Sequence, residues 1–224
     1  MADINMRIDK WISILIVLYF AVFAGTAHAA KLENLHRPNR RGSVSLEETL
    51  AKRRSIRQFE DKALTIDQIS QLFWAGQGIT KKSRGLRTAP SAGATYPLTL
   101  YGVTKDGVYR YLPGENSLQR ISSKDQRNKL SIASYGQRWI AKVPLNVLIT
   151  ADLTQMKSRY GDSAERYTDM EAGHVAQNIL LQAVALGLGA VPVGAFLKNP
   201  TKMMLGLPDN EIPLYIISIG YPKD

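Results

Sequence analysis

The longest periodic stretch of the sequence is AERYTDMEAGHVAQNILLQAVALG, residues 164–187. Its apolar residues recur every three or four positions, which is the period of an α-helix. A helix that is apolar around much of its circumference is buried, so we expect this one to be central or packed against a partner chain. The apolar residues are Ala172, Val175, Ala176, Ile179, Leu180, Ala183, Val184 and Leu186.

The same stretch contains polar residues that need an explanation. Glu171 and His174 have the Glu-x-x-His spacing of di-iron bundles, but such a site needs a second pair and two further glutamates. The sequence holds one pair, so we expect no metal site. Buried polar side chains are normally hydrogen-bonded. We therefore interpret Glu171, His174, Gln177 and Asn178 as a satisfied, buried polar stripe.

Helices and strands alternate along the chain around this helix. Capping-box patterns at 45–48 and 65–68 begin two helices, the first ending near Arg53. Asp106-Gly107 between two apolar runs predicts a β-hairpin. This alternation predicts an α+β or α/β fold with a central sheet. We expect strands at 98–104, 108–112, 145–150, 191–195 and 213–219, and further helices at 123–133 and from 199.

Residues 53–59, RRSIRQF, place three guanidiniums and a hydroxyl where the first helix gives way to extended chain. A guanidinium keeps its charge and presents a planar fork that fits phosphate oxygens. Since the carboxyl end of a helix repels phosphate, side chains would have to hold the anion here. The alternative is an ordinary solvated run of surface charge.

Residues 88–97, TAPSAGATYP, form a loop of small residues that leads directly into an apolar strand. Small residues let the backbone approach a flat ligand closely. The alternative is a connection without a binding role.

Composition excludes several classes of function. The chain has 224 residues, 45% of them hydrophobic, and no cysteine, so disulfides, cysteine nucleophiles and cysteine-ligated metals are excluded. It lacks the G-x-G-x-x-G, Walker A and G-x-S-x-G motifs. The net charge of +10 favours anionic partners, but no nucleic-acid-binding motif is present, and we expect no nucleic acid as a partner.

The amino terminus resembles an export signal. Residues 11–23 are almost entirely apolar, and Ala27-His28-Ala29 supplies the small-x-small pattern of a cleavage site. The run is shorter than the roughly 20 residues that span a bilayer. We expect a signal peptide at 1–29, an arm at 30–44 and one domain at 45–224, in a periplasmic or secreted protein without a stable membrane anchor. The alternative is an uncleaved amino-terminal anchor.

Five short blocks in order resemble the FMN-dependent nitroreductase superfamily, and within it the SagB-type, or thiazole/oxazole-oxidase-like, dehydrogenases. The resemblance covers residues 46–222, nearly all of the expected mature chain. It implies an α+β sandwich whose central, mostly antiparallel sheet is flanked by helices, and a homodimer formed through the long helix with FMN at the interface. The blocks are RRSIR at 53–57, PSAG at 90–93, EAGHVAQN at 171–178, GLGA at 187–190 and GYP at 220–222.

The resemblance also implies roles for individual residues. One group would hold the FMN phosphate and the pyrimidine edge, a second would lie along the flavin from the other subunit, and a third would offer backbone amides near N5 and O4. NAD(P)H would be the electron donor, and the substrate a small or peptide-derived molecule. The three groups are Arg53, Arg54, Ser55 and Arg57; Pro90, Ser91, Ala92 and Gly93; and Gly187, Leu188 and Gly189.

Two features depart from the family pattern. The chain ends at Asp224 without a late basic pair for the phosphate, and Arg159-Tyr160 stands where azoline-oxidising members carry a Lys-Tyr pair. An arginine is a poor general base because its pKa lies above about 12. Tyr160 is then the candidate catalytic residue, as a proton relay. The sequence predicts an exported FMN-dependent oxidoreductase, or alternatively a non-catalytic flavin-binding or interaction protein on the same fold.

Overall fold

The computed structural model describes residues 32–223, which form one compact unit. The expected signal peptide, residues 1–29, and the first two residues of the expected arm lie outside the described residues. Within residues 32–223, no helix is both long enough and apolar enough to cross a bilayer.

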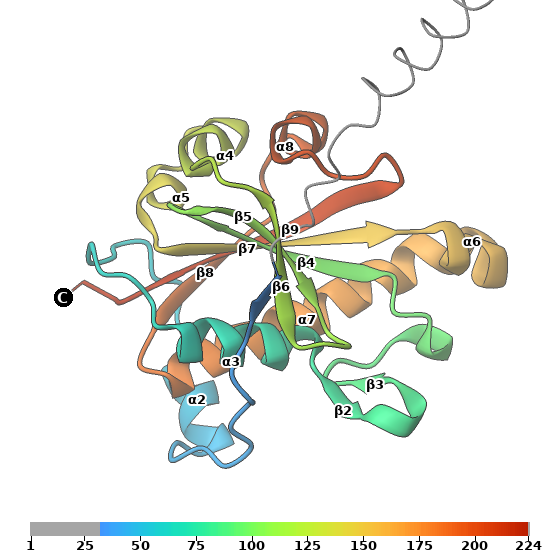
Figure 1. Cartoon of the computed structure of the whole chain (residues 1–224), viewed down its shortest axis with the longest axis horizontal. Coiled ribbons are helices and arrows are strands. Elements are labelled where there is room, and N and C mark those ends of the chain that lie inside the picture. Colours follow the sequence, from blue (N-terminus) through green and yellow to red (C-terminus); the bar gives the residue numbers. More distant parts are fainter. Residues whose placement is uncertain (1–31, 224) are drawn as a thin grey trace, which may run out of the picture. The chain divides into compact units, whose positions relative to one another are not determined.

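A central sheet of seven strands organises the described chain (Figure 1), in the order β1-β6-β5-β4-β7-β9-β8. Every pair of neighbouring strands is antiparallel. The expected α+β fold, with a central antiparallel sheet flanked by helices, is therefore confirmed. The strands are β1 (Leu32–Asn34), β4 (Leu98–Thr104), β5 (Gly107–Leu112), β6 (Ser117–Ser122), β7 (Leu145–Asp152), β8 (Gly189–Val193) and β9 (Glu211–Gly220).

Helices cover both faces of the sheet (Figure 1). On β7, Val147 and Ile149 pack toward α3 and α7, whereas Leu148 packs toward α4, α5 and α8, as the two-residue period of a strand requires. The two apolar layers are both fully buried. The helices on one side are α2 (Leu46–Lys52), α3 (Ile66–Gln77) and α7 (Ala164–Ala185), and on the other α4 (Arg127–Ala133), α5 (Arg138–Lys142) and α8 (Lys198–Leu205).

The helix starts differ in detail from expectation. Thr65 and Gln68 form the complete capping box that begins α3. At α2 only half of the box forms, because the Ser45 hydroxyl accepts from the Glu48 amide while the Glu48 carboxylate pairs with Lys52 at 2.6 Å. The first turn of α2 therefore keeps one fewer side-chain cap than the sequence suggested.

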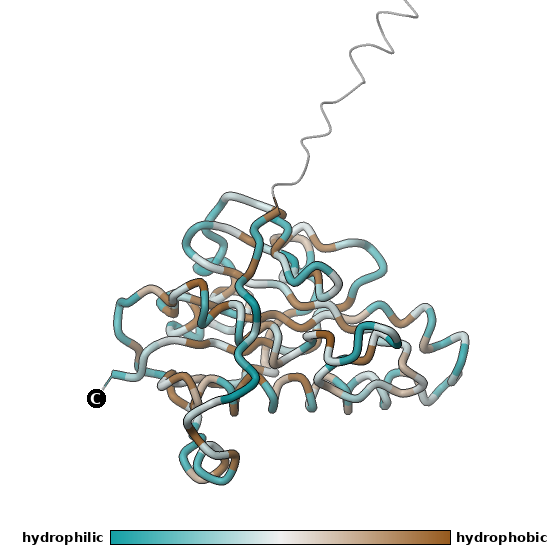
Figure 2. The backbone as a smooth tube through the Cα atoms, turned by 60° about the horizontal axis from the view of Figure 1, so that its bottom comes forward, coloured by the Kyte–Doolittle hydropathy of each residue, from teal (hydrophilic) through white to brown (hydrophobic). Residues whose placement is uncertain are grey.

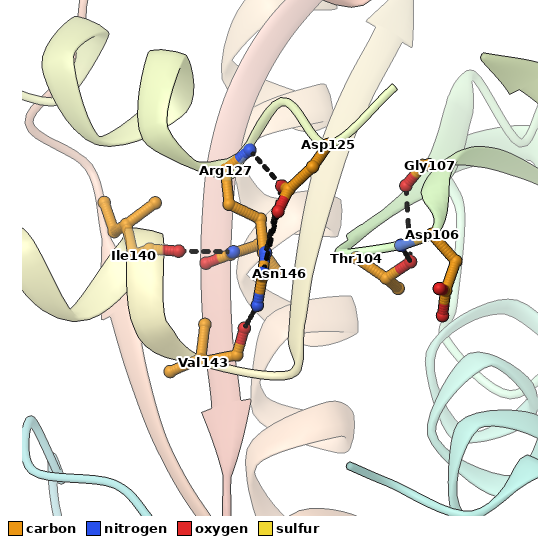
Figure 3. Close-up of polar contacts among 8 residues, drawn as sticks. All are labelled: Thr104, Asp106, Gly107, Asp125, Arg127, Ile140, Val143 and Asn146. Carbon is orange, nitrogen blue, oxygen red and sulfur yellow. Dashed lines mark hydrogen bonds and ion pairs between the residues drawn. The ribbon is translucent and has the colours of Figure 1, made fainter. Parts of the chain in front are cut away.

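The hairpin turn falls one residue earlier than expected. Lys105 and Asp106 form the turn, and Gly107 opens β5 opposite Thr104, with φ of 139°. A Cβ at Gly107 would lie 2.0 Å from the Ser122 carbonyl oxygen, so only glycine fits. The Thr104 hydroxyl accepts from the Asp106 amide at 3.1 Å and fixes the turn (Figure 3).

Sequence patterns did not indicate several short elements. Strands β1 and β6, helix α5 and helix α6 (Thr154–Tyr160) are all absent from the expected set. The arm continues from β1 across the molecule to α2, and its residues are mostly hydrophilic (Figure 2). The Ser70 hydroxyl donates to the His36 carbonyl at 2.7 Å, and Gln71 exchanges hydrogen bonds with the backbone of Asn39.

The long helix α7 is less buried than its composition suggested. Its inner face packs into the core, but Val184 and Leu186 are only half-buried. The expected satisfied polar stripe is wrong: Glu171 is buried, His174 and Gln177 are exposed, and Asn178 is half-buried. The helical period explains why Glu171 is buried and His174 is exposed. Residues three positions apart are rotated around the helix axis, so one can lie on the buried face and the other on the exposed face. The exposed residues of α7 are Glu165, Arg166, Asp169, Met170, Gly173, His174 and Gln177.

Candidate functional site

The arginine-rich segment, residues 53–59, leaves α2 and runs against the end of the sheet. Ser55 pairs with Ala190 as a short parallel bridge, and the Ile56 amide donates to the Ala190 carbonyl at 3.1 Å. Further along, Phe59 pairs with Pro222. The main chain is therefore anchored to β8 and to the end of β9, which leaves the polar side chains for other contacts.

These side chains take different directions. Arg54 folds back, and its Nη1 donates to the carbonyls of Ala51 and Arg53 at 3.0 and 2.7 Å, where the helix end is electronegative. The Arg57 guanidinium lies over the Trp139 ring, 5.5 Å from its centre. Within residues 32–223, the side chains of Arg53 and Ser55 form neither a hydrogen bond nor an ion pair. Arg53 and Ser55 are thus the groups best placed to take an external anion.

The glycines at the end of α7 serve the fold directly. Gly187, with φ of 70°, donates to the Val184 carbonyl at 3.0 Å, and the Leu188 amide donates to Ala183 at 2.8 Å. This is the Schellman arrangement that ends a helix. A Cβ at Gly189 would lie 2.9 Å from Ile56, so glycine is needed for the arginine-rich segment to pack there. The amides of Gly187 and Leu188, expected to face a ligand, are engaged inside the chain.

The small-residue loop, residues 88–97, is strained. Gly93, Ala94 and Tyr96 have φ values of 58°, 55° and 50°. The left-handed region costs a non-glycine residue about 1–3 kcal/mol where the surroundings enforce it, and such residues cluster at functional sites. Here the Ser91 hydroxyl accepts from the Tyr96 amide at 2.9 Å, and the Ala94 amide donates to the Ser91 carbonyl at 3.0 Å. The exposed residues at its tip are Pro90, Gly93 and Ala94.

The structure brings this loop together with Tyr160. Arg159 Nη1 donates to the Gly93 carbonyl at 2.9 Å. A Cβ at Gly93 would lie 2.5 Å from both the Arg159 guanidinium and the Tyr160 hydroxyl oxygen. Tyr160 in turn meets Tyr167 edge-on, with ring centres 5.3 Å apart. The half-buried Tyr160 therefore presents its hydroxyl at the tip of the loop.

Arg87 supports the loop from behind. Its guanidinium lies 4.6 Å from the centre of the Tyr96 ring, and its Nη1 donates to Gln77 Oε1 at 2.7 Å. Burial lowers the pKa of Arg87 from its ordinary value, and the neighbouring Glu171 carboxyl opposes that shift. Since an arginine pKa starts so high, Arg87 stays charged at neutral pH.

The two parts of the expected site lie at opposite ends of α7. The arginine-rich segment meets Ala190, just past the carboxyl end, whereas α6 and the loop lie at the amino end (Figure 1). At 1.5 Å per residue, Glu171 near the loop and Gly187 near the arginines are about 24 Å apart. Within one chain, the structure does not bring the arginines and the loop together.

The outer face of α7 borders a surface cleft of about 530 Å³ between α2, α3 and the arm. Apolar side chains are exposed on and beside this face, including Leu46 at 60% and Met170 at 52%. Gly173 sits in the middle of the exposed stripe, and a Cβ there would have no neighbour within 4 Å. We call the exposed residues Met170, Gly173, His174 and Gln177, with the half-buried Leu181 and Ala185, the α7 seam.

A smaller cavity of about 170 Å³ lies elsewhere, between the start of α3 and the sheet. Its walls include Ile69, Phe73 and Leu145, and it contains none of the residues expected to bind a cofactor. At its rim, Arg127 forms a two-point contact with Asp125 and donates to the Val143 carbonyl at 3.0 Å (Figure 3). The hydrogen bonds from Arg127 hold the pKa of Asp125 below its ordinary value. Sequence patterns gave no sign of this cavity, because its walls come from eight separate helices and strands and the segments that connect them.

No group of three histidine, aspartate or glutamate side chains within residues 32–223 is arranged to hold a metal ion.

Comparison with known proteins identifies relatives. The model of the nitroreductase family matches residues 50–221. A candidate nitroreductase of Methanocaldococcus jannaschii is 40% identical over 183 residues, covering 79% of this chain and 91% of that protein. The FMN reductase [NAD(P)H] of Bacillus subtilis is 27% identical over 192 residues, covering 79% of this chain and 65% of its own length. The crystal structure of a candidate nitroreductase from Ralstonia eutropha superposes with a TM-score of 0.80 at 28% identity, covering 88% of this chain and 93% of that one.

Proposed function

The chain belongs to the nitroreductase family, and we propose that it is an FMN-dependent oxidoreductase whose cofactor site is completed by a second copy of the chain. One observation carries the proposal: two groups of residues suited to the two ends of a flavin nucleotide lie about 24 Å apart along α7. Neither group forms a complete site within its own chain.

A two-fold dimer would join these half-sites. In such a dimer each surface patch meets its own copy. If two α7 helices cross at their midpoints in antiparallel directions, the carboxyl end of each helix lies beside the amino end of the other. Gly173 lies close to the midpoint of α7 and offers room for a close crossing. The arginine-rich segment of one subunit would then face loop 90–93 of the partner subunit. The exposed Met170 of the α7 seam and the exposed Leu46 beside it support this choice of interface.

The residues present fit FMN. Arg53 and Ser55 would hold the phosphate, since their side chains form no hydrogen bond or ion pair within residues 32–223. Arg57, stacked on Trp139, would lie toward the pyrimidine edge, and Arg54 would add positive charge. The small side chains of loop 90–93 would let its backbone pack along the ring, and the strain in the loop is typical of such a site. Bound FMN supplies two-electron hydride chemistry, and the protein supplies orientation and electrostatics.

We propose NAD(P)H as electron donor, supported by the name of the Bacillus subtilis relative. Tyr160 would hold a proton near the ring face, because its hydroxyl lies at the tip of the loop. Arg159 is bound to the Gly93 carbonyl and would shape the loop rather than act as a base. The SagB-type resemblance supports a small or peptide-derived substrate. The signal-like amino terminus supports export.

Titration of the purified protein with FMN tests the proposal. Losing one charge-assisted hydrogen bond costs about 1.5–3 kcal/mol, so Arg53→Ala should raise the FMN dissociation constant roughly 10- to 150-fold. Arg84→Ala, which removes an exposed arginine elsewhere, is the charge-matched control and should change it little. An equal loss of FMN affinity in both variants would mean that FMN binding depends on the net charge of the protein rather than on this site.

The rival hypothesis is a flavin-binding protein without turnover. Anaerobic addition of NADH or NADPH to the FMN-loaded protein separates the two. Loss of the flavin absorbance band favours an enzyme, and an unchanged band favours a passive binder.

A further inference from the structure

Glu171 is a buried carboxyl without a hydrogen bond. It lies on the inner face of α7 and is 2% exposed, and neither of its oxygens has a partner within residues 32–223. The other buried glutamate is different: Glu211, 3% exposed, accepts from Tyr101 and Thr150 and pairs with Arg110. Since buried polar groups are normally satisfied, Glu171 needs a specific explanation.

The groups around Glu171 form a chain of contacts that returns to the strained loop. Helix α7 packs against loop residues 92–94, and Ser91, Arg87 and Gln77 are the polar groups that bear on the Glu171 carboxyl. Arg87 Nη1 donates to Gln77 Oε1 at 2.7 Å, and the Arg87 amide donates to the Tyr96 hydroxyl oxygen at 3.2 Å. The Tyr96 amide donates to Ser91 Oγ at 2.9 Å. We call Gln77, Arg87, Ser91 and Tyr96 the polar ring; Glu171 closes it from α7.

The charge balance around Glu171 favours the neutral acid more than in water. Burial is the largest influence and raises the pKa of Glu171, whereas Ser91, Arg87 and Gln77 oppose the rise. The ionisable groups that bear on it are Arg87 and, around the guanidinium, Tyr96 and Tyr111. A neutral carboxyl has one donor and retains acceptor capacity. It can donate to Ser91 Oγ and accept from Gln77 Nε2, which itself has no partner within residues 32–223.

We propose that Glu171 is a positioning residue, which holds the inner side of loop 91–96 through Ser91 and the polar ring and so fixes the shape of the outer side. The importance of that outer side rests on the proposed flavin site. The role of Glu171 in ordering the loop does not.

The geometry makes the loop depend on such support. Gly93, Ala94 and Tyr96 are all in the left-handed region, so the loop keeps its shape only while its contacts enforce it. Ser91 both influences the Glu171 carboxyl and accepts from the Tyr96 amide. A substitution at Glu171 would therefore affect the conformation of the exposed tip, Gly93 and Ala94, through the Ser91 hydroxyl.

Hydrogen exchange of the loop amides, measured without flavin, tests the inference. In Glu171→Leu, the amides of Ala94 and Tyr96 should exchange at least about tenfold faster than in the wild type, while amides of β7 keep their protection. Glu171→Gln retains a donor and an acceptor and should restore wild-type protection. Glu165→Gln, on an exposed position of the same helix, is the control and should change nothing.

A pH series separates positioning from simple packing. Corrected for intrinsic rates, loop exchange in the wild type should change as Glu171 titrates, and in Glu171→Gln it should not. Unchanged loop protection in a folded Glu171→Leu variant, or identical pH profiles in wild type and Glu171→Gln, would overturn the inference. If Glu171→Leu does not fold, the pH series of the wild type and Glu171→Gln decides alone, because both proteins keep the hydrogen bond from the Tyr96 amide to Ser91 Oγ. A loosened loop in a protein that never binds FMN would support this inference while rejecting the flavin site.

Discussion

At the scale of single residues, Gly93 joins the loop to Arg159 and Tyr160. Replacing it with alanine should destabilise the protein for two reasons: the left-handed backbone and a Cβ 2.5 Å from two side chains. The backbone cost alone is about 1–2 kcal/mol. Gly85 offers a matched control, because its φ is 62° and a Cβ there would have no neighbour within 4 Å. Chemical denaturation should therefore show a larger loss for Gly93→Ala than for Gly85→Ala, and equal losses would mean that Arg159 and Tyr160 move aside freely.

Glu171 should give the stability a characteristic pH dependence. Its pKa is raised above the ordinary 4.5, so the folded state binds the proton more tightly than the unfolded chain does. The free energy of unfolding should then fall as pH rises from 4.5 through the raised pKa. The lowered pKa values of Asp125 and Asp152 act below 3.8, outside this window. Urea unfolding across the window should show this fall in the wild type but not in Glu171→Gln; the same slope in both would exclude Glu171 as its source.

At the scale of elements, α7 determines both the core and the proposed interface. Its inner face packs on α3 and the sheet, and its outer seam is unpaired within residues 32–223. Glycine inside a helix costs about 1 kcal/mol relative to alanine, and nothing in the described part of the chain, residues 32–223, fills the space beside Gly173. In the proposed dimer, close packing of a second α7 helix would account for that cost.

The proposed dimer predicts that the wild type sediments with twice the mass of one chain and that Gly173→Leu sediments as a monomer without loss of helix. Sedimentation velocity measures the mass, and circular dichroism the helix content. Lys129→Leu places the same side chain on an exposed position of α4, on the opposite face of the sheet, and should leave the mass unchanged. A Gly173→Leu variant that sediments like the wild type would show that the helices do not cross there.

The sequence predicted the elements with strong local signals. The period of α7, the capping box at Thr65 and the hairpin before Gly107 depend on neighbouring residues, and all three appear in the structure. Short elements such as β6 and α5 carry weak local signals and are stabilised by tertiary packing, so they were missed. Local patterns can mislead even within one helical turn: Glu48 was expected to cap α2, but its carboxylate pairs with Lys52 instead.

The sequence predicted which residue types could form the site, but not the directions in which their side chains point. The arginines and the small-residue loop are visible in the sequence, whereas the stacking of Arg57 on Trp139 depends on contacts 82 positions apart in the chain. Gly189 was expected to offer its backbone amide to the flavin; the structure adds a packing reason for this glycine, because Ile56 occupies the space where a Cβ would lie. The sequence led us to expect that the Glu171 carboxyl is hydrogen-bonded. Its lack of a partner depends on the folded arrangement of other segments, which composition does not reveal.

At the scale of the whole molecule, the proposed function requires that each FMN site combine arginines from one subunit with the loop of the other. Two defective variants can test it together. Arg53→Ala damages the first half-site and Gly93→Val the second, and each alone should bind FMN poorly. Unfolding and refolding an equal mixture allows the chains to form mixed dimers.

The amount of FMN bound per chain in that refolded mixture then shows whether the site is shared between subunits. With random pairing in two-fold dimers, half of the dimers are mixed and each regains one intact site, so about a quarter of all sites should recover wild-type affinity. Each variant refolded alone provides the baseline. Recovery near a quarter supports a site shared between subunits, and a mixture that binds no more than the two variants alone would contradict it.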